Sequence, residues 1–170
     1  MEEGNQKVPR RKESSSSHKK VFVETFDGRT VPGYVTPAHL WRAEGLELLN
    51  VNGEVEHMEL ERVRTVYFVN DFREKFLPER KSFLSRPKLA GLWVRVKYRD
   101  EETLEGVVAN DLVALLDRGV NLVPPDPGTN CTRIFIPRPA IAEMTVLGVV
   151  GIARRTSARP AVGQPTLFNE

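Results

Sequence analysis

The sequence has little cysteine and no long hydrophobic run, and each shortage excludes a class of protein. Its single cysteine, Cys131, cannot form an internal disulfide, which suits a reducing cytoplasm. The longest apolar stretch, 144–153, is about half of what a membrane span requires, and the N-terminus is charged where a secretory signal would be apolar. We therefore expect a soluble, cytoplasmic protein of 170 residues with no membrane contact.

Patterns that mark catalytic or metal sites are also missing. The histidines His18, His39 and His57 share no metal-ligand spacing with each other or with Cys131. The glycines are isolated instead of forming a phosphate-binding loop, and the acidic run 100–102 fits a solvated turn. Catalysis needs a nucleophile with a base, paired carboxylates, a metal or a phosphate cradle. We therefore expect a protein that is not an enzyme and holds no cofactor and no metal.

An internal repeat is the main feature that is present. Segment 21–35, VFVETFDGRTVPGYV, aligns without a gap on segment 94–108, VRVKYRDEETLEGVV, at an offset of 73. Arg62 then falls over Arg138 as the loops widen. The further matching segments are 45–48 over 119–122 and 57–69 over 133–148. The chain therefore contains two copies of one structural unit.

Each copy alternates between apolar and polar residues with the period of a β-strand. In the second copy Val94, Val96 and Tyr98 point one way, while Arg95 and Lys97 point the other. About five short strands fit in each copy, which is too few for a sandwich. We expect an all-β protein in which each copy bends into a small antiparallel barrel, because closure removes exposed edges.

The repeated hairpin carries a resemblance to a known fold. Asp27-Gly28 is a strong hairpin signal, whereas Asp100-Glu101 in the second copy lacks the glycine, so we expect a looser turn there. The pattern resembles the first signature of the Sm-like small β-barrels, which bind RNA as rings. The matching residues are Val21, Val23, Asp27, Gly28, Val31 and Gly33, and in the second copy Val94, Val96, Asp100, Leu104 and Gly106.

The resemblance implies two Sm-like or SH3-like barrels in tandem, at 21–72 and 93–150. The tandem layout, together with PPDPGTN, RIFIPRPAI and VLG in the second copy, also resembles an uncharacterised bacterial family of paired Sm-like domains. In the Sm-like family an Asn and an Arg line the RNA pocket, which makes Asn121 and Arg138 candidates here. Pro139 after Arg138 departs from the family pattern. A hydrogen bond at a strand end and a surface charge are the alternative interpretation of the two residues.

Basic segments surround the two copies. Residues 1–20 carry six basic and three acidic groups at low hydrophobicity and predict a disordered arm, and 151–170 predict a disordered tail. The linker 73–92 contains several Phe and Leu residues, so we expect it to pack across one or both barrels. The alternative is contact with nucleic acid through its basic residues Arg80, Lys81, Arg86 and Lys88.

The tail ends in a peptide with a recognisable pattern. Gln164, Leu167 and Phe168 in QPTLF, 164–168, resemble the peptide by which bacterial replication and repair proteins bind the sliding clamp. Two apolar side chains can enter a preformed cleft while Gln, a donor and an acceptor, satisfies its rim. Folding back of Leu167 and Phe168 on a barrel is the alternative.

The sequence therefore favours a non-enzymatic adaptor that a C-terminal peptide recruits to a protein partner, the sliding clamp, and so to replicating or repaired DNA. An Sm-like RNA-binding regulator and a structural module for protein interactions are the alternatives. The ligand of each barrel, the oligomeric state and a pseudo-dimeric arrangement of the copies stay open at this point.

Overall fold

A computed structural model describes residues 18–40, 45–111, 118–126 and 129–151. These residues form an all-β architecture, which confirms the prediction from the alternating pattern. None of their helices is long and apolar enough to cross a membrane. The elements are β1 (Lys19–Thr25), β2 (Thr30–Val35), α1 (Pro37–Leu40), β3 (Gly45–Asn50), β4 (Val55–Glu59), β5 (Val63–Val69), β6 (Gly91–Tyr98), β7 (Thr103–Val108), β8 (Gly119–Val123), β9 (Cys131–Pro137), the 3-10 turn η1 (Arg138–Ala140) and β10 (Ile141–Val150).

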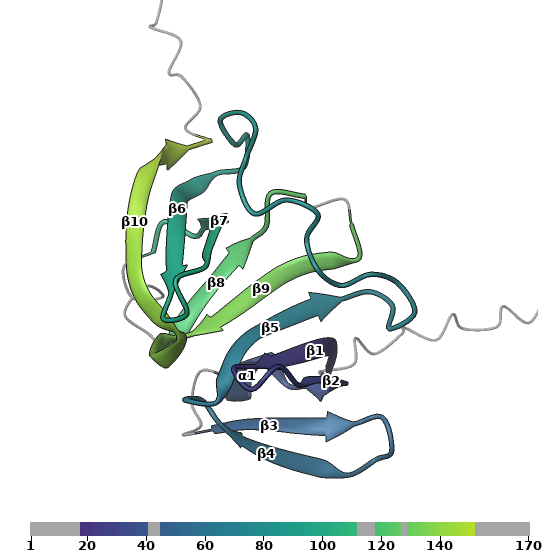
Figure 1. The fold of residues 1–170 in the computed structure, drawn as a ribbon. Coiled ribbons are helices and arrows are strands. Elements are labelled where there is room, and N and C mark those ends of the chain that lie inside the picture. The colour runs from purple at the N-terminus through teal and green to yellow at the C-terminus, as the bar shows by residue number, and fades with distance from the viewer. Residues whose placement is uncertain (1–17, 41–44, 112–117, 127–128, 152–170) are drawn as a thin grey trace, which may run out of the picture.

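All ten strands belong to one antiparallel sheet, in the order β10-β6-β7-β8-β9-β5-β1-β2-β3-β4 (Figure 1). The sheet is open: within the described residues, β4 and β10 each have a neighbour on one side only. This differs from the expectation that closure would remove the edges.

The two copies seen in the sequence have the same strand order in the structure. In the first half β1 lies between β5 and β2, and in the second half β6 lies between β10 and β7. Val23 pairs with Val66 where its counterpart Val96 pairs with Met144. Both halves therefore follow the same order, fifth-first-second-third-fourth strand.

The strand registers correct part of the sequence alignment. Glu47 pairs with His57 where its counterpart Asn121 pairs with Phe135, so His57 corresponds to Phe135 and not to Arg133. The alignment of 57–69 on 133–148 is therefore wrong by two residues at its start. A shift of two leaves every side chain on the same face of a strand, so the alternating pattern could not detect it.

The first hairpin turns of the two halves are equally tight. The N–H of Gly28 donates to the Thr25 carbonyl at 3.0 Å, and the N–H of Glu101 donates to the Tyr98 carbonyl at the same distance. Gly28 has φ +84° and Glu101 has φ +70°. The prediction of a looser second turn is wrong, because Glu101 adopts the left-handed conformation in spite of its side chain.

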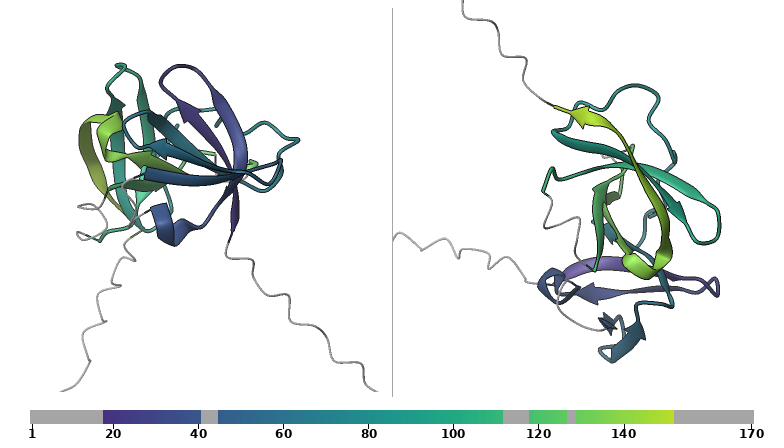
Figure 2. Two further views of the ribbon diagram at one scale, coloured as in Figure 1. Left: turned by 90° about the horizontal axis from the view of Figure 1, so that it is seen from below. Right: turned by 90° about the vertical axis from the view of Figure 1, so that its left-hand side faces the viewer.

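The two halves are joined by the pairing of β5 with β9 (Figures 1 and 2). Val66 lies opposite Phe135, Tyr67 opposite Ile134 and Phe68 opposite Arg133. The antiparallel pairing therefore continues from one half into the other, with one register irregularity between Phe68 and Val69.

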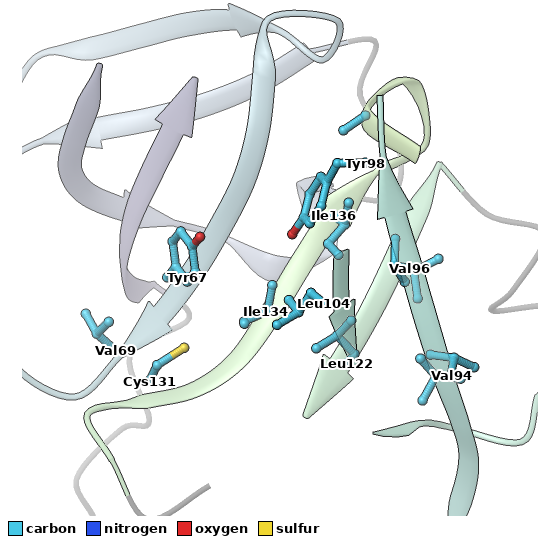
Figure 3. Packing of buried hydrophobic residues seen from close by; sticks show 13 residues of the cluster. Tyr67, Val69, Val94, Val96, Tyr98, Leu104, Leu122, Cys131, Ile134 and Ile136 are labelled. Carbon is cyan, nitrogen blue, oxygen red and sulfur yellow. The ribbon is translucent and has the colours of Figure 1, made fainter. Parts of the chain in front are cut away.

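Two hydrophobic clusters form the core, one for each half. At the junction each cluster also includes side chains from a strand of the other half. Tyr67 and Val69 of β5 belong to the cluster of the second half, while Phe135 of β9 belongs to that of the first. Figure 3 shows Tyr67 from β5 on one side of Ile134 from β9, with Val94 and Val96 of β6 farther to the right. Burial of each such side chain contributes about 1.5–3 kcal/mol, so the junction is part of the core.

The segment between β5 and β6 packs through its aromatic residues. Phe76 stacks on Phe22 of β1 at 4.3 Å between ring centroids, and Phe83 contacts Trp93 of β6 edge to face at 6.1 Å. The leucines of this segment, which we also expected to pack, are exposed: they are Leu77, Leu84 and Leu89.

Candidate functional site

A basic cavity of about 310 Å³ lies beside the junction of the two halves. Lys19 and Lys20 reach it from the start of β1, and Arg133 reaches it from β9. Asn121 of β8 and Thr132 of β9 add polar groups to its wall. Residues more than 100 positions apart in the chain therefore meet because β9 pairs with β5, next to β1.

The three cations of the cavity are not neutralised by acidic side chains. Within the described residues no carboxylate lies within 4.0 Å of the charged nitrogens of Lys19, Lys20 or Arg133. The Lys20 ammonium donates to the Asn70 carbonyl at 3.0 Å and lies 5.8 Å from the centre of the Phe72 ring. Three positive charges around one cavity, with no acidic partner in the described part of the chain, favour an anionic ligand.

Asn121 brings an unsatisfied acceptor to the same cavity. Its side-chain oxygen Oδ1 is buried and has no hydrogen-bond donor among the described residues. Leaving a buried acceptor without a partner costs about 1–3 kcal/mol, and such groups are uncommon in folded proteins. A donor from outside the protein, such as a ligand N–H group or a water molecule, would complete this site.

The structure separates Asn121 from the second residue that the resemblance implied. Arg138 begins η1, just beyond the end of β9, and its N–H donates to the Arg118 carbonyl at 2.7 Å. Arg138 does not line the basic cavity, whereas Arg133 does. The 3-10 turn that includes Pro139 leads the chain from β9 toward β10 at this end of the strand.

Most of the predicted basic residues of the linker contact the second half of the protein. The Arg80 guanidinium lies 3.8 Å from the Asp126 carboxylate, and the Lys81 ammonium donates to Glu102 at 2.7 Å. Arg86 donates to the Val149 carbonyl at 2.5 Å. Lys88 is exposed. The described contacts of Arg80, Lys81 and Arg86 therefore hold the linker on Asp126, on the turn between β6 and β7, and on β10.

A second cavity, of about 250 Å³, lies between the halves and is lined by a paired polar network. Arg64 of β5 bonds to Glu24 at 3.0 Å, to Asp100 at 2.7 Å and to Glu102 at 3.1 Å. Burial opposes the charge on Arg64, but Asp100 and Glu24 outweigh it and raise the pKa of Arg64. The guanidinium also lies 4.3 Å from the centre of the Tyr98 ring. This arrangement joins the two halves and leaves Arg64 little capacity for a ligand.

Two tyrosines in this second cavity are kept in their neutral form. Burial raises the pKa of Tyr98 to about 12, and its hydroxyl hydrogen-bonds to Thr65. Burial also raises the pKa of Tyr67, whose hydroxyl donates to Glu24 at 2.9 Å. Neither hydroxyl is prepared to act as a base at neutral pH.

The three cations of the basic cavity are not among the residues that the sequence pattern singles out. The prediction of a disordered arm up to residue 20 is wrong at its end, because Lys19 and Lys20 are the first residues of β1 and pair with β2. Arg133 carries no motif in the sequence. The position of Arg133 could have indicated its role. Arg133 lies on the exposed face of β9, where a charged side chain is accessible to a ligand. The predicted tail residues Gln164, Leu167 and Phe168 lie outside the described residues.

Metal binding has no candidate in the described part of the chain, where no group of three or more His, Cys, Asp or Glu side chains could hold an ion. No curated protein and no solved structure matches the sequence. One family model does match, over residues 17–148, and this range includes the basic cavity and all ten strands except the last two residues of β10. The chain therefore belongs to the family of unknown function DUF6982.

Proposed function

We propose that the two halves are Sm-like barrels in tandem. Their common strand order supports this, since each half places its fifth strand next to its first. The two separate core clusters support it as well, with one cluster centred on each half. In this proposal the barrels form one rigid body, because β5–β9 pairing and the Arg64 network both cross the junction.

For the whole chain we propose the role of a non-enzymatic adaptor that is recruited by its C-terminal peptide. The observation that carries this is the match of Gln164, Leu167 and Phe168 to the clamp-binding pattern. Burial of Leu and Phe in a preformed cleft supplies about 2 kcal/mol each, and ordering the peptide opposes part of it. We therefore expect a dissociation constant in the micromolar range for the bacterial sliding clamp.

Titration of purified clamp with the full chain, followed by calorimetry, tests the recruitment. Phe168→Ala should reduce the affinity at least tenfold, whereas Thr166→Ala, at a tolerant position of the pattern, should leave it within about twofold. A wild-type chain that gives no binding heat at a clamp concentration of a few hundred micromolar would refute the proposed partner.

The barrels have a second candidate function, which is binding of single-stranded RNA at the basic cavity. The specific observation is the buried, unpaired Oδ1 of Asn121 beside Lys19, Lys20 and Arg133. Lys and Arg attract the phosphates, and an amide oxygen can accept a hydrogen bond from a base N–H group. Such binding requires no catalytic group.

Fluorescence anisotropy with single-stranded RNA oligonucleotides of different sequence tests this candidate at several salt concentrations. Arg133→Glu should weaken binding at least tenfold and reduce its salt dependence, because one phosphate contact is lost. Lys88→Glu makes the same charge change at an exposed position that does not line the cavity, and it should have an effect below about threefold. Equal effects of both substitutions would indicate that RNA responds only to the overall charge of the protein. They would rule out a specific RNA site at the basic cavity.

A further inference from the structure

The linker ends in a loop, residues 82–90, that presents leucines to solvent and is termed the leucine loop below. Figure 1 shows this connection projecting beyond the strands just before β6. Leu84 is 80 % exposed and Leu89 is 41 % exposed. Val149 of β10 is 39 % exposed and lies nearby, because the Arg86 guanidinium donates to its carbonyl. Exposed apolar residues that gather in one place usually mark a surface for a partner or a membrane.

The exposure of Leu84 does not come from a loosely held loop. The residue before it, Phe83, packs edge to face on Trp93 of β6, with 6.1 Å between the ring centroids. On the other side Arg86 bonds to β10, and Pro87 is buried. The leucine loop is therefore held on both sides of Leu84, so a partner that covers this side chain has little backbone to order.

The charge beside the exposed leucines is positive. Residues 82–90 include Arg86 and Lys88 and no acidic residue. Among the residues that the structure describes, no carboxylate lies within 4.0 Å of the charged nitrogens of either side chain. These two cations therefore favour a partner with negative charge.

The basic start of the tail adds to this charge. Gly151, the last described residue, lies against Ala90 at the end of the leucine loop, since a Cβ on Gly151 would lie 2.3 Å from the Cα of Ala90. Arg154 and Arg155 follow within four residues, and four residues span at most about 14 Å. Four cations can therefore reach one surface beside the exposed leucines.

Apolar side chains on an ordered, projecting loop with cations around them match the surface of an anionic lipid bilayer. Leucine can enter the boundary between headgroups and acyl chains, while Lys and Arg contact anionic headgroups. We propose that the leucine loop binds an anionic membrane surface peripherally, with Leu84 and Leu89 inserted and with Arg86 and Lys88 at the headgroups. The expectation of no membrane contact follows from the lack of a membrane span in the sequence, which a peripheral contact does not need. This inference does not depend on the clamp or RNA proposals.

A nucleic acid fits the leucine loop less well than a lipid surface. Single strands stack their bases on aromatic side chains, but Phe83, the aromatic residue of the loop, already packs on Trp93. Leucine has no flat face for stacking. A protein partner would need a concave surface to receive a projecting loop, whereas a fluid lipid interface adapts to its shape.

Cosedimentation of the full chain with lipid vesicles tests the proposal. Phosphatidylcholine vesicles with about 30 mol % phosphatidylglycerol should bind the chain at least tenfold more strongly than vesicles of phosphatidylcholine alone. Leu84→Ser should weaken binding to the mixed vesicles about tenfold, and Lys88→Glu at least about fivefold. The matched controls are Val51→Ser, at an exposed valine after β3, and Lys75→Glu, at an exposed lysine outside the leucine loop. Both should stay within about twofold of the wild type.

A fluorescent reporter tests the insertion itself. Leu84→Trp adds an indole at the exposed position, and its emission should shift to shorter wavelength with the mixed vesicles, whereas Val51→Trp should add no shift. Wild-type binding by Leu84→Ser together with weaker binding by Lys88→Glu would show attraction to charge alone and would overturn the proposal. Failure of the wild type to bind the mixed vesicles at low salt would overturn it as well, and is the result expected if the partner is an acidic protein.

Discussion

The Arg64 side chain of β5 donates a hydrogen bond from Nε to the Asp100 carboxylate, at 2.7 Å, across the junction of the two halves. Arg64 is 11 % exposed, and it also reaches Glu24 and Glu102, so one cation bridges three carboxylates from different strands and turns. Its position makes this residue the main polar link between β5 and the β6–β7 hairpin.

Replacement of Arg64 should therefore destabilise the whole protein. Arg64→Met keeps most of the apolar stem but leaves Glu24, Asp100 and Glu102 without their common partner. We expect the free energy of unfolding to fall by about 2–4 kcal/mol, measured by urea denaturation. Arg62→Met, which removes an exposed guanidinium 3.8 Å from Asp27, should cost less than about 1 kcal/mol. Similar losses in both variants would contradict the role of the link.

The same network predicts how stability depends on pH. A hydrogen bond from Arg64 holds the pKa of Asp100 below its usual 3.8, and one from Lys81 lowers the pKa of Glu102 below 4.5. Because these pKa values are lower in the folded state, the unfolded chain takes up protons first on acidification. Their contribution is complete above about pH 4.5 and is lost as the pH falls through 3.8 and below.

Urea denaturation between pH 3 and pH 7 measures this dependence. In Arg64→Met the fall in the free energy of unfolding below pH 4.5 should be smaller than in the wild type, since the largest cause of the Asp100 shift is gone. An unchanged slope would show that Arg64 does not set the pKa of Asp100.

Glu105 on β7 should anchor the linker. Its buried carboxylate accepts hydrogen bonds from the N–H of Phe83 at 3.1 Å, from Trp93 Nε1 at 3.1 Å and from Arg95 Nη2 at 2.8 Å. Burial opposes ionisation of Glu105, but these donors outweigh it and lower its pKa. We expect Glu105→Ala to destabilise the protein by about 2–3 kcal/mol and to speed proteolysis of the linker around Phe83. Glu101→Ala, at an exposed turn, should leave the cleavage rate unchanged.

Gly33 and Gly106 occupy equivalent places in the two halves, and both should resist any side chain. A Cβ on Gly33 would lie 2.6 Å from the Leu49 carbonyl oxygen, and one on Gly106 would lie 2.5 Å from the Leu122 side chain. Alanine at either position should reduce the free energy of unfolding by about 1–3 kcal/mol. Gly148→Ala is the control, because nothing lies within 4 Å of its Cβ. A neutral Gly33→Ala would contradict the close packing of β2 on β3.

The Cys131 thiol should be inert in the native protein. Burial raises its pKa to about 12, so very little thiolate is present at pH 8. Ellman's reagent should therefore modify native protein far more slowly than protein in urea. Rapid modification without denaturant would show that the junction between β5 and β9 opens.

The sequence was sufficient for the strands and for the repeat, because both depend on local pattern. Val94, Val96 and Tyr98 are buried, as their alternation with Arg95 and Lys97 predicted. The pairing of β5 with β9 was not predictable, since apolar alternation does not specify which neighbour a strand takes. The order of the strands is set by contacts between distant segments.

The basic cavity could not be predicted for a related reason. Asn121 was named from the resemblance, but its neighbours Lys19, Lys20 and Arg133 come from β1 and β9, which meet only through the β5–β9 junction. The candidate Arg138 lies beyond the end of β9, in η1, and the alternating sequence pattern does not show where β9 ends. The linker cations Arg80, Lys81 and Arg86 contact groups that only the folded chain brings near them.

Synthesis on the ribosome gives the β5–β9 pairing a further consequence. The first half is complete once β5 has emerged, but the strand that covers β5 lies about 60 residues further along the chain, as the bonds between Asn70 and Asn130 show. During that interval a nascent chain presents β5 and β4 as two bare edges at once. Neighbouring ribosomes on one messenger RNA hold such half-made chains close together, so the delay before β9 arrives is the period in which incorrect strand exchange between chains competes with folding.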